Sequence, residues 1–334
     1  MLMVSNASKA IGTVILNYKR WEETIACLES VIASTTPPAW IVIVDNASNN
    51  ESVAKFREWG AKNIASKAGG VAPLAEEKQF ENFIDYDHKS KELPPPASII
   101  LLRLSQNRGY AAGNNAGIRL LMQCGADAVW ILNNDTVVEK KALSAMQQRL
   151  FSKARPGLCG SLIFYYDTHI VQCRAGGKTR PWTGLSYLDG YMFAREEALA
   201  EPPEVIEDRI NFVYGASVMA SRAFIESVGL MDERYFLYCE EQDWAYSATG
   251  RFDLAYAPEA VVYHKEGVST GFSSKQANFK SLYYLTRSRL LLTAKHHPWA
   301  LPTVGLSILF AALRMFWRRV CTSRVPSSLK NDRA

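Results

Sequence analysis

Four short apolar runs alternate with segments of helical spacing, and this alternation constrains the fold of the chain more than any other feature. Each run is long enough for one buried strand, and residues 22–33 between the first two place apolar side chains on one side of a helix. Such an alternation predicts an α/β fold with a mostly parallel central sheet and helices on both faces. The four runs occupy residues 11–17, 40–44, 98–104 and 128–132.

Residues 60–97 interrupt this alternation. The segment holds three consecutive prolines near its end and no long apolar run, so it predicts an inserted loop with one or two weak helical turns. Helices are expected on either side of it, over 52–59 and 113–124.

Composition narrows the class of protein. Hydrophobic residues make up 48% and charged residues 21% of the 334 residues, which is typical of a globular chain and excludes a disordered or collagen-like one. The six cysteines form no Cys-x-x-Cys pair, so we expect reduced, cytoplasmic thiols and no zinc cluster or disulfide framework. Residues 1–10 lack the apolar core of a secretory signal.

The formal charge of +5 is concentrated near the C-terminal end. Residues 295–334 hold seven basic residues and one acidic residue, so the rest of the chain is close to neutral. A near-neutral body with a basic tail is a poor nucleic-acid footprint and favours contact with a membrane surface. We therefore expect no nucleic-acid partner.

Polar side chains follow every predicted strand at the point where it ends. Open sheets bind ligands at the carboxyl ends of their strands, so these side chains are candidate binding residues. Asn and Asp are also ordinary turn residues, which leaves a structural role open for any single strand end. The strand ends carry Asn17 and Tyr18, Asp45 and Asn46, Asn107, and Asn133, Asn134 and Asp135.

Asp135 is a candidate metal ligand. A carboxylate at a strand tip, flanked by amides, suits Mg²⁺ or Mn²⁺ with water and phosphate oxygens as the remaining ligands. The alternative is that Asp135 caps a helix that starts near Glu139.

The segment 107–117 is rich in small residues and opens a helix. Backbone amides at such a turn can face the phosphates or ribose of a nucleotide, but close packing of a helix on the sheet needs the same small residues. Its glycine spacing is not a dinucleotide fingerprint, and the chain has no GxxxxGK[ST] loop.

Three carboxylates gather at the start of a predicted helix that ends near Gly250. Glu240, Glu241 and Asp243 repel one another, which raises at least one pKa and suits a general base. The alternative is a solvated first helical turn, although the apolar run 235–238 before it argues for burial. His264 ends another apolar run, where a lone histidine is more often a core or surface residue.

Six ordered blocks stand out along residues 12–292. They read VILNYKRWEETIACLESV, VIVDNAS, NRGYAAGNNAGI, WILNNDTVV, VYGASVMASRAFIESVGLMDERYFLYCEEQDW and HKEGVST. In this order they resemble the family 2 glycosyltransferases, particularly the rhamnosyltransferase-like branch that builds bacterial surface polysaccharides.

The resemblance implies the GT-A fold. A nucleotide-sugar-binding half at 1–135, with the insertion 60–97, and an acceptor-binding half at 136–275 would form one continuous domain, followed by C-terminal helices at 276–334. The implied reaction transfers a sugar from a nucleotide diphosphate, with inversion, to a lipid-linked or polysaccharide acceptor, and the branch suggests dTDP-L-rhamnose as donor. The processive synthases' Gln-x-x-Arg-Trp signature is absent, which favours a single addition.

The resemblance also implies roles for the metal and the base. Asn133-Asn134-Asp135 is similar to the family's DXD motif, with Asp135 as the metal ligand and His264 closing over the metal and diphosphate. The family's Glu-Asp-x-Asp motif corresponds to residues 240–243, which puts the base on Glu241 and leaves Asp243 as a rival.

The remaining roles divide between acceptor and donor. Gly215 and Ala216 resemble the small-residue turn that admits the acceptor, with Trp244 on the same side. The donor would meet Asn17, Tyr18, Asp45, Asn107, Gly109, Asn114, Asn133 and Asn134.

Two other classes of function compete with this interpretation. A catalytically silent sugar-nucleotide-binding subunit of a glycan-assembly complex would not need Asp135, the acidic cluster and His264 together. A sugar-1-phosphate nucleotidyltransferase would need a Gly-rich loop after the first strand, and residues 17–21 contain no glycine.

Residues 299–320 predict an amphipathic helix, after a helix over 281–295. The uncharged stretch 296–313 is short and broken for a membrane span. We expect the helix to lie in the bilayer interface at the inner face of the cell membrane; packing on the catalytic domain or a second subunit is the alternative. Ser307, Ala311, Arg314 and Arg318 form its polar side, and Leu306, Leu309, Phe310, Leu313, Phe316, Trp317 and Val320 its apolar side.

Overall fold

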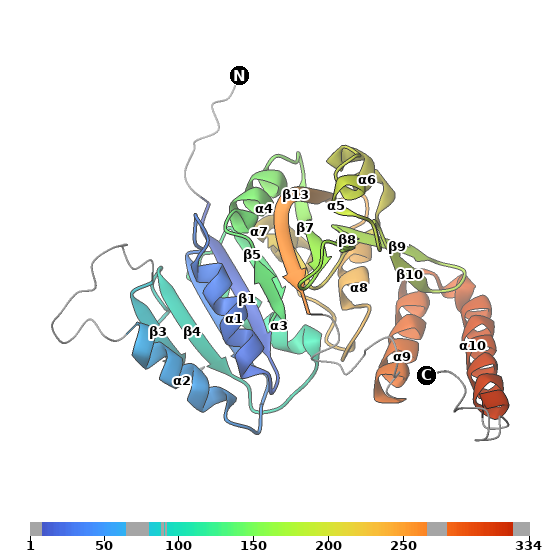
Figure 1. The fold of residues 1–334 in the computed structure, drawn as a ribbon, viewed down its shortest axis with the longest axis horizontal. Helices are drawn as coiled ribbons and strands as arrows, with labels where there is room; N and C mark the ends of the chain where they lie inside the picture. Colours follow the sequence, from blue (N-terminus) through green and yellow to red (C-terminus); the bar gives the residue numbers. More distant parts are fainter. Residues whose placement is uncertain (1–8, 65–79, 88–89, 91, 266–278, 323–334) are drawn as a thin grey trace, which may run out of the picture.

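A ten-stranded mixed sheet forms the centre of the computed structural model, which describes residues 9–64, 80–87, 90, 92–265 and 279–322. Its N-terminal half is parallel throughout, in the order β3-β4-β2-β1-β5 (Figure 1). These strands are β1 (Ile11–Asn17), β2 (Trp40–Asp45), β3 (Asn82–Tyr86), β4 (Ser98–Arg103) and β5 (Ala128–Asn133).

The second half of the chain extends the same sheet. β12 pairs antiparallel with β5 and with β7, β7 pairs in parallel with β13, and β13 pairs antiparallel with β6. β8 pairs antiparallel with the far end of β7. The strands are β6 (Thr136–Val138), β7 (Pro156–Tyr165), β8 (Val171–Arg174), β12 (Ser217–Ser221) and β13 (Asp253–His264).

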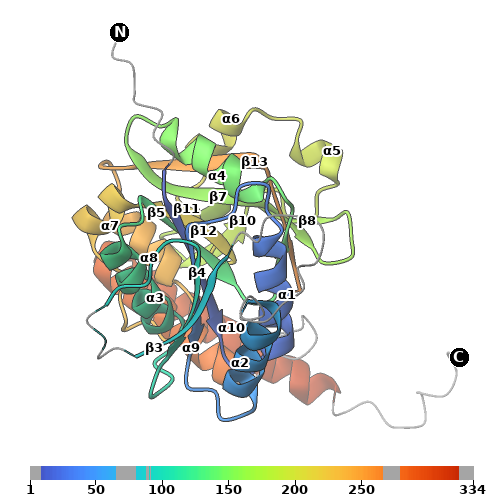
Figure 2. The ribbon, with the colours of Figure 1, turned by 90° about the vertical axis from the view of Figure 1, so that its left-hand side faces the viewer.

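Helices cover both faces of the sheet, as predicted (Figure 2). Side chains alternate along a strand, so neighbouring residues of β1 enter different cores: Ile15 packs in the cluster that contains Leu28, and Val14 in the cluster that contains Ile118. The first face carries α1 (Trp21–Ile32), α2 (Ser52–Asn63) and α4 (Ala142–Phe151), and the second α3 (Tyr110–Cys124), α7 (Arg222–Val228) and α8 (Glu240–Ser247).

A smaller three-stranded sheet is formed by residues from the second half of the chain. β9 (Gly176–Arg180) pairs antiparallel with β10 (Leu185–Leu188) and β11 (Phe212–Val213). Two short helices, α5 (Arg195–Ala198) and α6 (Pro203–Arg209), connect β10 to β11.

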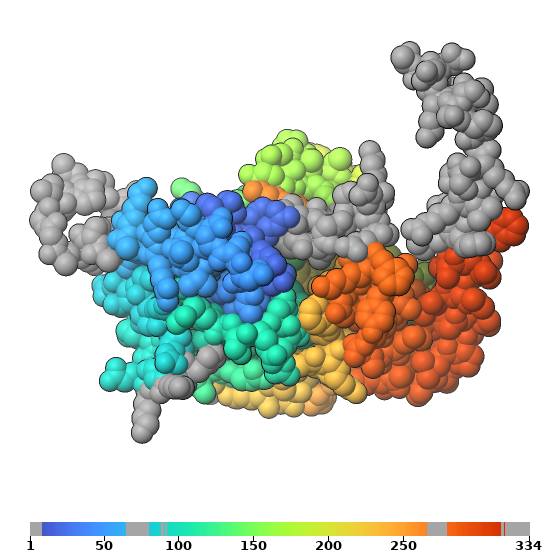
Figure 3. Space-filling view, turned by 90° about the horizontal axis from the view of Figure 1, so that it is seen from below, coloured from blue at the N-terminus to red at the C-terminus, as the bar shows by residue number. Residues whose placement is uncertain are grey.

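Two long helices complete the described chain. α9 (Phe279–His296) and α10 (Leu301–Thr322), joined by the 3-10 turn at Pro298–Ala300, lie side by side at the end of the molecule far from α2 (Figures 1 and 3). Within the described residues, no helix has both the length and the apolar character that a membrane crossing requires.

The structure corrects two expectations. Within 60–97, α2 continues to Asn63 and Asn82–Tyr86 forms the edge strand β3, where a loop was predicted; residues 65–79 lie outside the described part. β3 has only five residues, so its alternation of apolar and polar side chains is too short to be recognised in the sequence. The helix expected near Glu139 begins instead at Ala142, after β6, so Asp135 does not cap it.

The helix α3 begins at a glycine that no other residue can replace without cost. Gly109 has φ +97° and ψ −176°, and a Cβ there would lie 2.3 Å from the carbonyl oxygen of Phe236. The amide of Tyr110 donates to that same oxygen at 2.8 Å, so the two segments are in close contact.

Replacing Gly109 by Ala tests this contact. Overpacking typically costs about 1–3 kcal/mol, so Gly109→Ala should lower the free energy of unfolding by at least ~1 kcal/mol more than Gly229→Ala does. Gly229 is the matched control because it has nearly the same backbone (φ 91°, ψ −172°) and open space around it. Urea unfolding measures both; equal losses would contradict a steric role for the Phe236 carbonyl.

Candidate functional site

A cavity of about 360 Å³ opens at the carboxyl ends of β1, β2 and β5. This is the edge of the sheet at which the sequence predicted a site. The segment after Tyr235 and the first turns of α9 close its other side. Its lining comprises Leu16, Tyr18, Asn46, Asn107, Gly109, Tyr110, Asn133, Asn134, Asp135, Phe236, Leu237, Lys280, Ser281 and Tyr284.

Three predicted donor-side residues do not line this cavity. Asn17 and Asp45 are buried at adjacent strand ends, where Asn17 Nδ2 donates to Asp45 Oδ1 at 2.7 Å. The other Asp45 oxygen accepts the amide of Ser48 at 3.0 Å. Asn114 is buried inside α3, and its Nδ2 donates to the carbonyl oxygen of Tyr110. The contacts of all three are with other protein groups at the edge of the site. Asn46, the residue that follows β2, lines the cavity instead.

Asp135 and His264 meet because of strand pairing. β13 runs antiparallel to β6, and this register sets His264 opposite Thr136, the residue that follows Asp135. His264 Nε2 lies 3.2 Å from Asp135 Oδ1, and both side chains are buried. The structure therefore brings together two residues that lie far apart in the sequence.

Gln172 of β8 sets the orientation of this imidazole. Its Oε1 lies 2.8 Å from His264 Nδ1, and an amide oxygen only accepts, so Nδ1 carries a proton. In the neutral ring Nε2 then presents a lone pair to the Asp135 carboxylate. Two acceptors held face to face favour a cation between them.

The pair fits a divalent ion by donor chemistry and spacing. Neighbouring ligands of an octahedral ion with bonds of about 2.1 Å are about 3.0 Å apart, close to the 3.2 Å measured between Nε2 and Oδ1. Among the described residues, no group of three His, Cys, Asp or Glu side chains could hold a metal. Water and substrate oxygens would have to complete the shell, which is usual for Mg²⁺ and common with Mn²⁺.

Glu241 lies near the cavity residue Tyr110, at the turn that contains Gly215. A Cβ on Gly215 would lie 3.4 Å from Glu241 Oε1 and 3.5 Å from the hydroxyl of Tyr110, a residue that lines the cavity. Tyr110 donates that hydroxyl to the carbonyl oxygen of Gly215 at 2.7 Å. Glu241 thus lies directly behind the small-residue turn that the sequence assigned to the acceptor.

Burial prepares Glu241 for proton transfer. It raises the pKa of Glu241 to about 7, and burial together with the adjacent Glu241 carboxylate raises the pKa of Glu240 well above its ordinary value. In the described part of the chain, no hydrogen bond reaches Oε2 of either residue. A carboxyl group that titrates near neutral pH and has a free oxygen can accept a proton.

Asp243, the predicted rival base, is committed elsewhere. Its Oδ2 accepts from Lys295 Nζ at 2.8 Å, and its Oδ1 lies 2.8 Å from His296 Nε2 and 3.2 Å from the hydroxyl of Tyr235. These contacts tie α8 to the last turn of α9. The geometry therefore favours Glu241 over Asp243 as the base.

The structure corrects the acceptor role of Trp244. Its side chain is buried in the second core, where the ring packs edge-on against Phe224 at 5.0 Å and Nε1 donates to the carbonyl oxygen of Gly229. Ala216 is also buried, and its carbonyl oxygen accepts the amide of Asn133, which aligns the acceptor turn with β5. Helical periodicity would have placed Trp244 on the core side of α8.

Sequence reasoning missed four residues of the site. The rings of Phe236 and Tyr284 stack at 4.5 Å and line the cavity together with Tyr18, which gives aromatic surface for a planar base. Tyr110 donates a hydrogen bond to the carbonyl oxygen of Gly215, and Gln172 accepts one from His264. The first three belong to aromatic segments that were visible in the sequence, whereas nothing around Gln172 marks its role.

Replacing Asp243 should lower the stability of the protein more than replacing a carboxylate of an exposed ion pair. Asp243→Asn removes the charge that Lys295 and His296 contact, and hydrogen bonds to charged groups contribute about 1.5–3 kcal/mol, so the free energy of unfolding should fall by about that amount. Glu226→Gln, which breaks the exposed pair with Arg222, is the control and should cost about 1 kcal/mol or less. Thermal and urea unfolding measure both, and an unchanged stability of Asp243→Asn would contradict the anchoring role.

The sequence of the chain is similar to those of two glycosyltransferases. No protein-family model matches the chain. The chain is similar to the low-salt glycan biosynthesis hexosyltransferase Agl10 of Haloferax volcanii, with 24% identity over 245 residues that cover 71% of this chain and 61% of that protein. It is also similar to N-acetylglucosaminyl-diphospho-decaprenol L-rhamnosyltransferase of Mycobacterium tuberculosis, with 25% identity over 60% of this chain and 69% of that protein. The chain thus spans about three fifths of the length of the first relative.

Two solved structures share the fold. One is GalNAc-T7 with UDP, GalNAc and Mn²⁺ (TM-score 0.57, 16% identity, 86% of this chain and 48% of that one). The other is the mannosyltransferase PcManGT from Pyrobaculum calidifontis with GDP-Man and Mn²⁺ (TM-score 0.52, 15% identity, 91% and 75%). Relatives and fold together confirm the resemblance predicted from the sequence: this chain has the GT-A fold and is similar to glycosyltransferases, a hexosyltransferase and an L-rhamnosyltransferase among them.

Proposed function

We propose that the chain is a metal-dependent, inverting glycosyltransferase of family 2. It moves a sugar from a nucleotide diphosphate to a lipid-linked or polysaccharide acceptor in cell-surface glycan synthesis. The observation that carries the proposal is that Asp135, paired with His264, and Tyr110 line one cavity, while the Glu241 carboxyl and the Tyr110 hydroxyl both lie within 3.5 Å of where a Cβ on Gly215 would be.

The donor occupies the cavity at the strand ends. Phe236, Tyr284 and Tyr18 supply aromatic surface for a base, and Asn107, Asn133 and Asn134 supply hydrogen-bonding groups. UDP and GDP-Man in the two structures of the same fold support a nucleotide-diphosphate donor, and the mycobacterial relative supports L-rhamnose as its sugar.

Asp135 and His264 would hold the divalent ion. When bound, the ion neutralises the negative charge that develops on the departing diphosphate. Gln172 keeps the proton of His264 on Nδ1, so that Nε2 stays available as a ligand. The Mn²⁺ in both solved structures supports this assignment.

Glu241 takes the proton of the acceptor hydroxyl. As the acceptor oxygen forms its bond to the anomeric carbon, the bond from that carbon to the diphosphate oxygen breaks on the opposite face. The proton passes to Glu241, and the electron pair leaves with the nucleoside diphosphate. Gly215 and Ala216 leave the space through which the acceptor hydroxyl approaches.

The site works at the inner face of the cell membrane. The decaprenol-linked acceptor in the name of the mycobacterial relative supports a lipid-linked acceptor here, and the basic C-terminal segment supports peripheral contact through 299–320. A lipid-linked acceptor and a helix at the bilayer surface would bring enzyme and substrate into the same plane.

Glu241→Gln tests the base. The change preserves shape and removes the acceptor of the proton, so kcat should fall on the order of 10²–10⁴-fold with little change in stability. Glu226→Gln serves as the surface control and should retain full turnover. Turnover is measured by release of the nucleoside diphosphate from a panel of nucleotide sugars.

The pH dependence of kcat/KM is a second test of Glu241 as the base. Protonated Glu241 cannot accept a proton, so kcat/KM should fall about tenfold per pH unit below a pH of about 7. If the variant kept full turnover and the pH profile of the native chain, Glu241 would not be the base. If the native chain bound the donor and released no nucleoside diphosphate from it, the silent-subunit alternative would be correct.

A thermal-shift screen tests donor and metal together. A ligand that binds only the folded chain raises the melting temperature, so dTDP, UDP and GDP sugars should do so, each more strongly with Mn²⁺ than with EDTA. The Mn²⁺-dependent part should disappear in Asp135→Ala and His264→Ala and remain in Glu241→Gln. Stabilisation by none of these nucleotides, with or without metal, would refute the proposal.

A further inference from the structure

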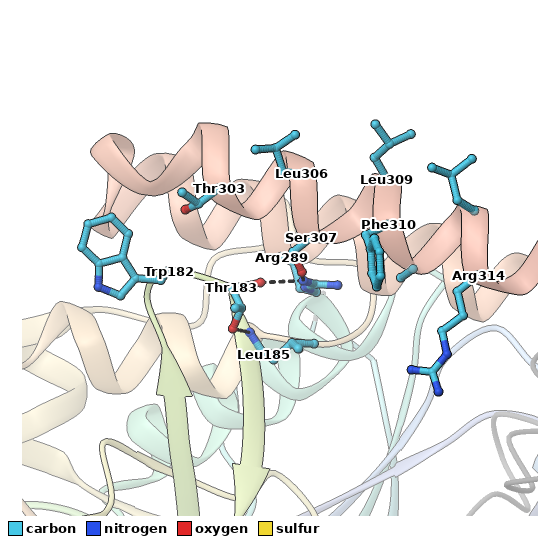
Figure 4. Close-up of a pocket in the computed structure, with 12 residues that line it drawn as sticks. Trp182, Thr183, Leu185, Arg289, Thr303, Leu306, Ser307, Leu309, Phe310 and Arg314 are labelled. Atoms are coloured by element: carbon cyan, nitrogen blue, oxygen red, sulfur yellow. Dashed lines mark hydrogen bonds between the residues drawn. The ribbon is translucent and has the colours of Figure 1, made fainter.

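A second cavity, of about 1000 Å³, lies where α10 and α9 meet the β9–β10 hairpin. It shares no lining residue with the donor cavity. Figure 4 shows Ser307 and Phe310 of α10 on one side of it and Thr183 and Leu185 of the hairpin on the other.

A buried cation lines this cavity. Arg289 of α9 is only 8% exposed, and its Nη2 donates to the carbonyl oxygen of Thr183 (2.5 Å) and to Ser307 Oγ (3.2 Å). Its Nε is buried and donates no hydrogen bond within the described chain. Throughout the described ranges Arg289 hydrogen-bonds to a carbonyl and a hydroxyl oxygen and forms no ion pair with a carboxylate, and burial lowers the pKa of its guanidinium. A buried charge without a counter-ion is costly, so an anion in the cavity would be stabilised.

The side of α10 that faces away from this cation is apolar. Leu306 and Leu309 point away from the hairpin in Figure 4 and are 64% and 55% exposed. Trp182 and Trp299 pack edge-on at 4.5 Å beside them, and both rings remain more than half exposed. Tryptophan at the rim of an apolar surface is typical of proteins that enter the bilayer interface.

We propose that this cavity binds the phosphate of an anionic phospholipid in the bilayer surface. Arg289 holds the phosphate, Arg314 at the edge of the cavity adds a second charge, and the acyl chains pass Phe310. Leu306 and Leu309, on the other side of the same helix, face the surrounding bilayer. The inference deepens the membrane contact proposed above and requires no step of the sugar transfer.

Charge distinguishes this occupant from a second copy of the chain. A two-fold interface sets the same patch of both copies face to face, which would bring Arg289 and Arg314 near their own equivalents. Residues 295–334 hold seven basic residues and one acidic residue, so the whole region repels a copy of itself. Anionic headgroups supply the opposite charge.

Vesicle flotation of the full chain tests the site. The protein should bind vesicles of phosphatidylcholine with phosphatidylglycerol more tightly than vesicles of phosphatidylcholine alone. Loss of one cation near an anionic surface costs about 1 kcal/mol, or about fivefold in affinity, so Arg287→Gln on the same helix should lower binding by no more than that. Arg289→Gln should lower it by at least about tenfold.

A second variant separates the site from a folding defect. Ser307→Asp places a carboxylate next to Arg289 Nη2 and so supplies the missing counter-ion. It should raise the melting temperature and at the same time weaken binding to phosphatidylglycerol vesicles. A damaged fold cannot produce both effects.

Four outcomes would overturn the inference. Equal losses in Arg289→Gln and Arg287→Gln would indicate surface charge without a site. An Arg289-dependent rise in melting temperature with inorganic phosphate, without preference for phosphatidylglycerol, would indicate a soluble anion as the ligand. A dimer that Leu309→Ser dissociates, with no vesicle binding, would indicate a second copy. Failure of the native chain to bind any vesicle would also remove the proposed membrane contact, but not the nucleotide and Mn²⁺ stabilisation that tests the transferase.

Discussion

The antiparallel pairing of β13 with β6 is the constraint on which the candidate site depends. It sets His264 opposite Thr136 and therefore beside Asp135, and the parallel pairing of β13 with β7 brings β8 and its Gln172 to the other side of the imidazole. A slip of one residue in this register would turn His264 to the opposite face of the sheet. The two halves of the chain thus share one sheet, and the candidate metal site lies where they join.

The acidic turn of α8 shows how burial gives neighbouring carboxylates different roles. Glu240 and Glu241 are held without a cationic partner in the described chain, so burial keeps their protons bound to higher pH. Asp243, one turn closer to α9, meets Lys295 and His296 and stays paired. The same short segment therefore supplies both a buried carboxyl whose pKa is about 7 and a structural anchor.

That anchor makes α9 part of the site. Its first turns contribute Lys280, Ser281 and Tyr284 to the donor cavity, its middle carries Arg289, and its last turn binds Asp243. A single helix therefore connects the donor cavity to the apolar surface of α10.

The sequence by itself determined the layered fold and the edge of the sheet that holds the cavity. Hydrophobic periodicity is a local property, and parallel strands necessarily end at one edge, so Tyr18, Asn107 and Asn133 could be assigned to the site from their positions alone. The strand Asn82–Tyr86 escaped prediction because an edge strand has a weaker pattern.

Only the tertiary structure decided what each polar residue does. Asn17 and Asp45 bond to each other, Trp244 packs in a core, and Asp243 binds a helix that begins far along the chain. Gln172 and Arg289 gained their importance in the same way, through partners from other elements. The physical reason is that burial and charge pairing depend on neighbours in space, which a pattern of residues along one strand or helix does not specify.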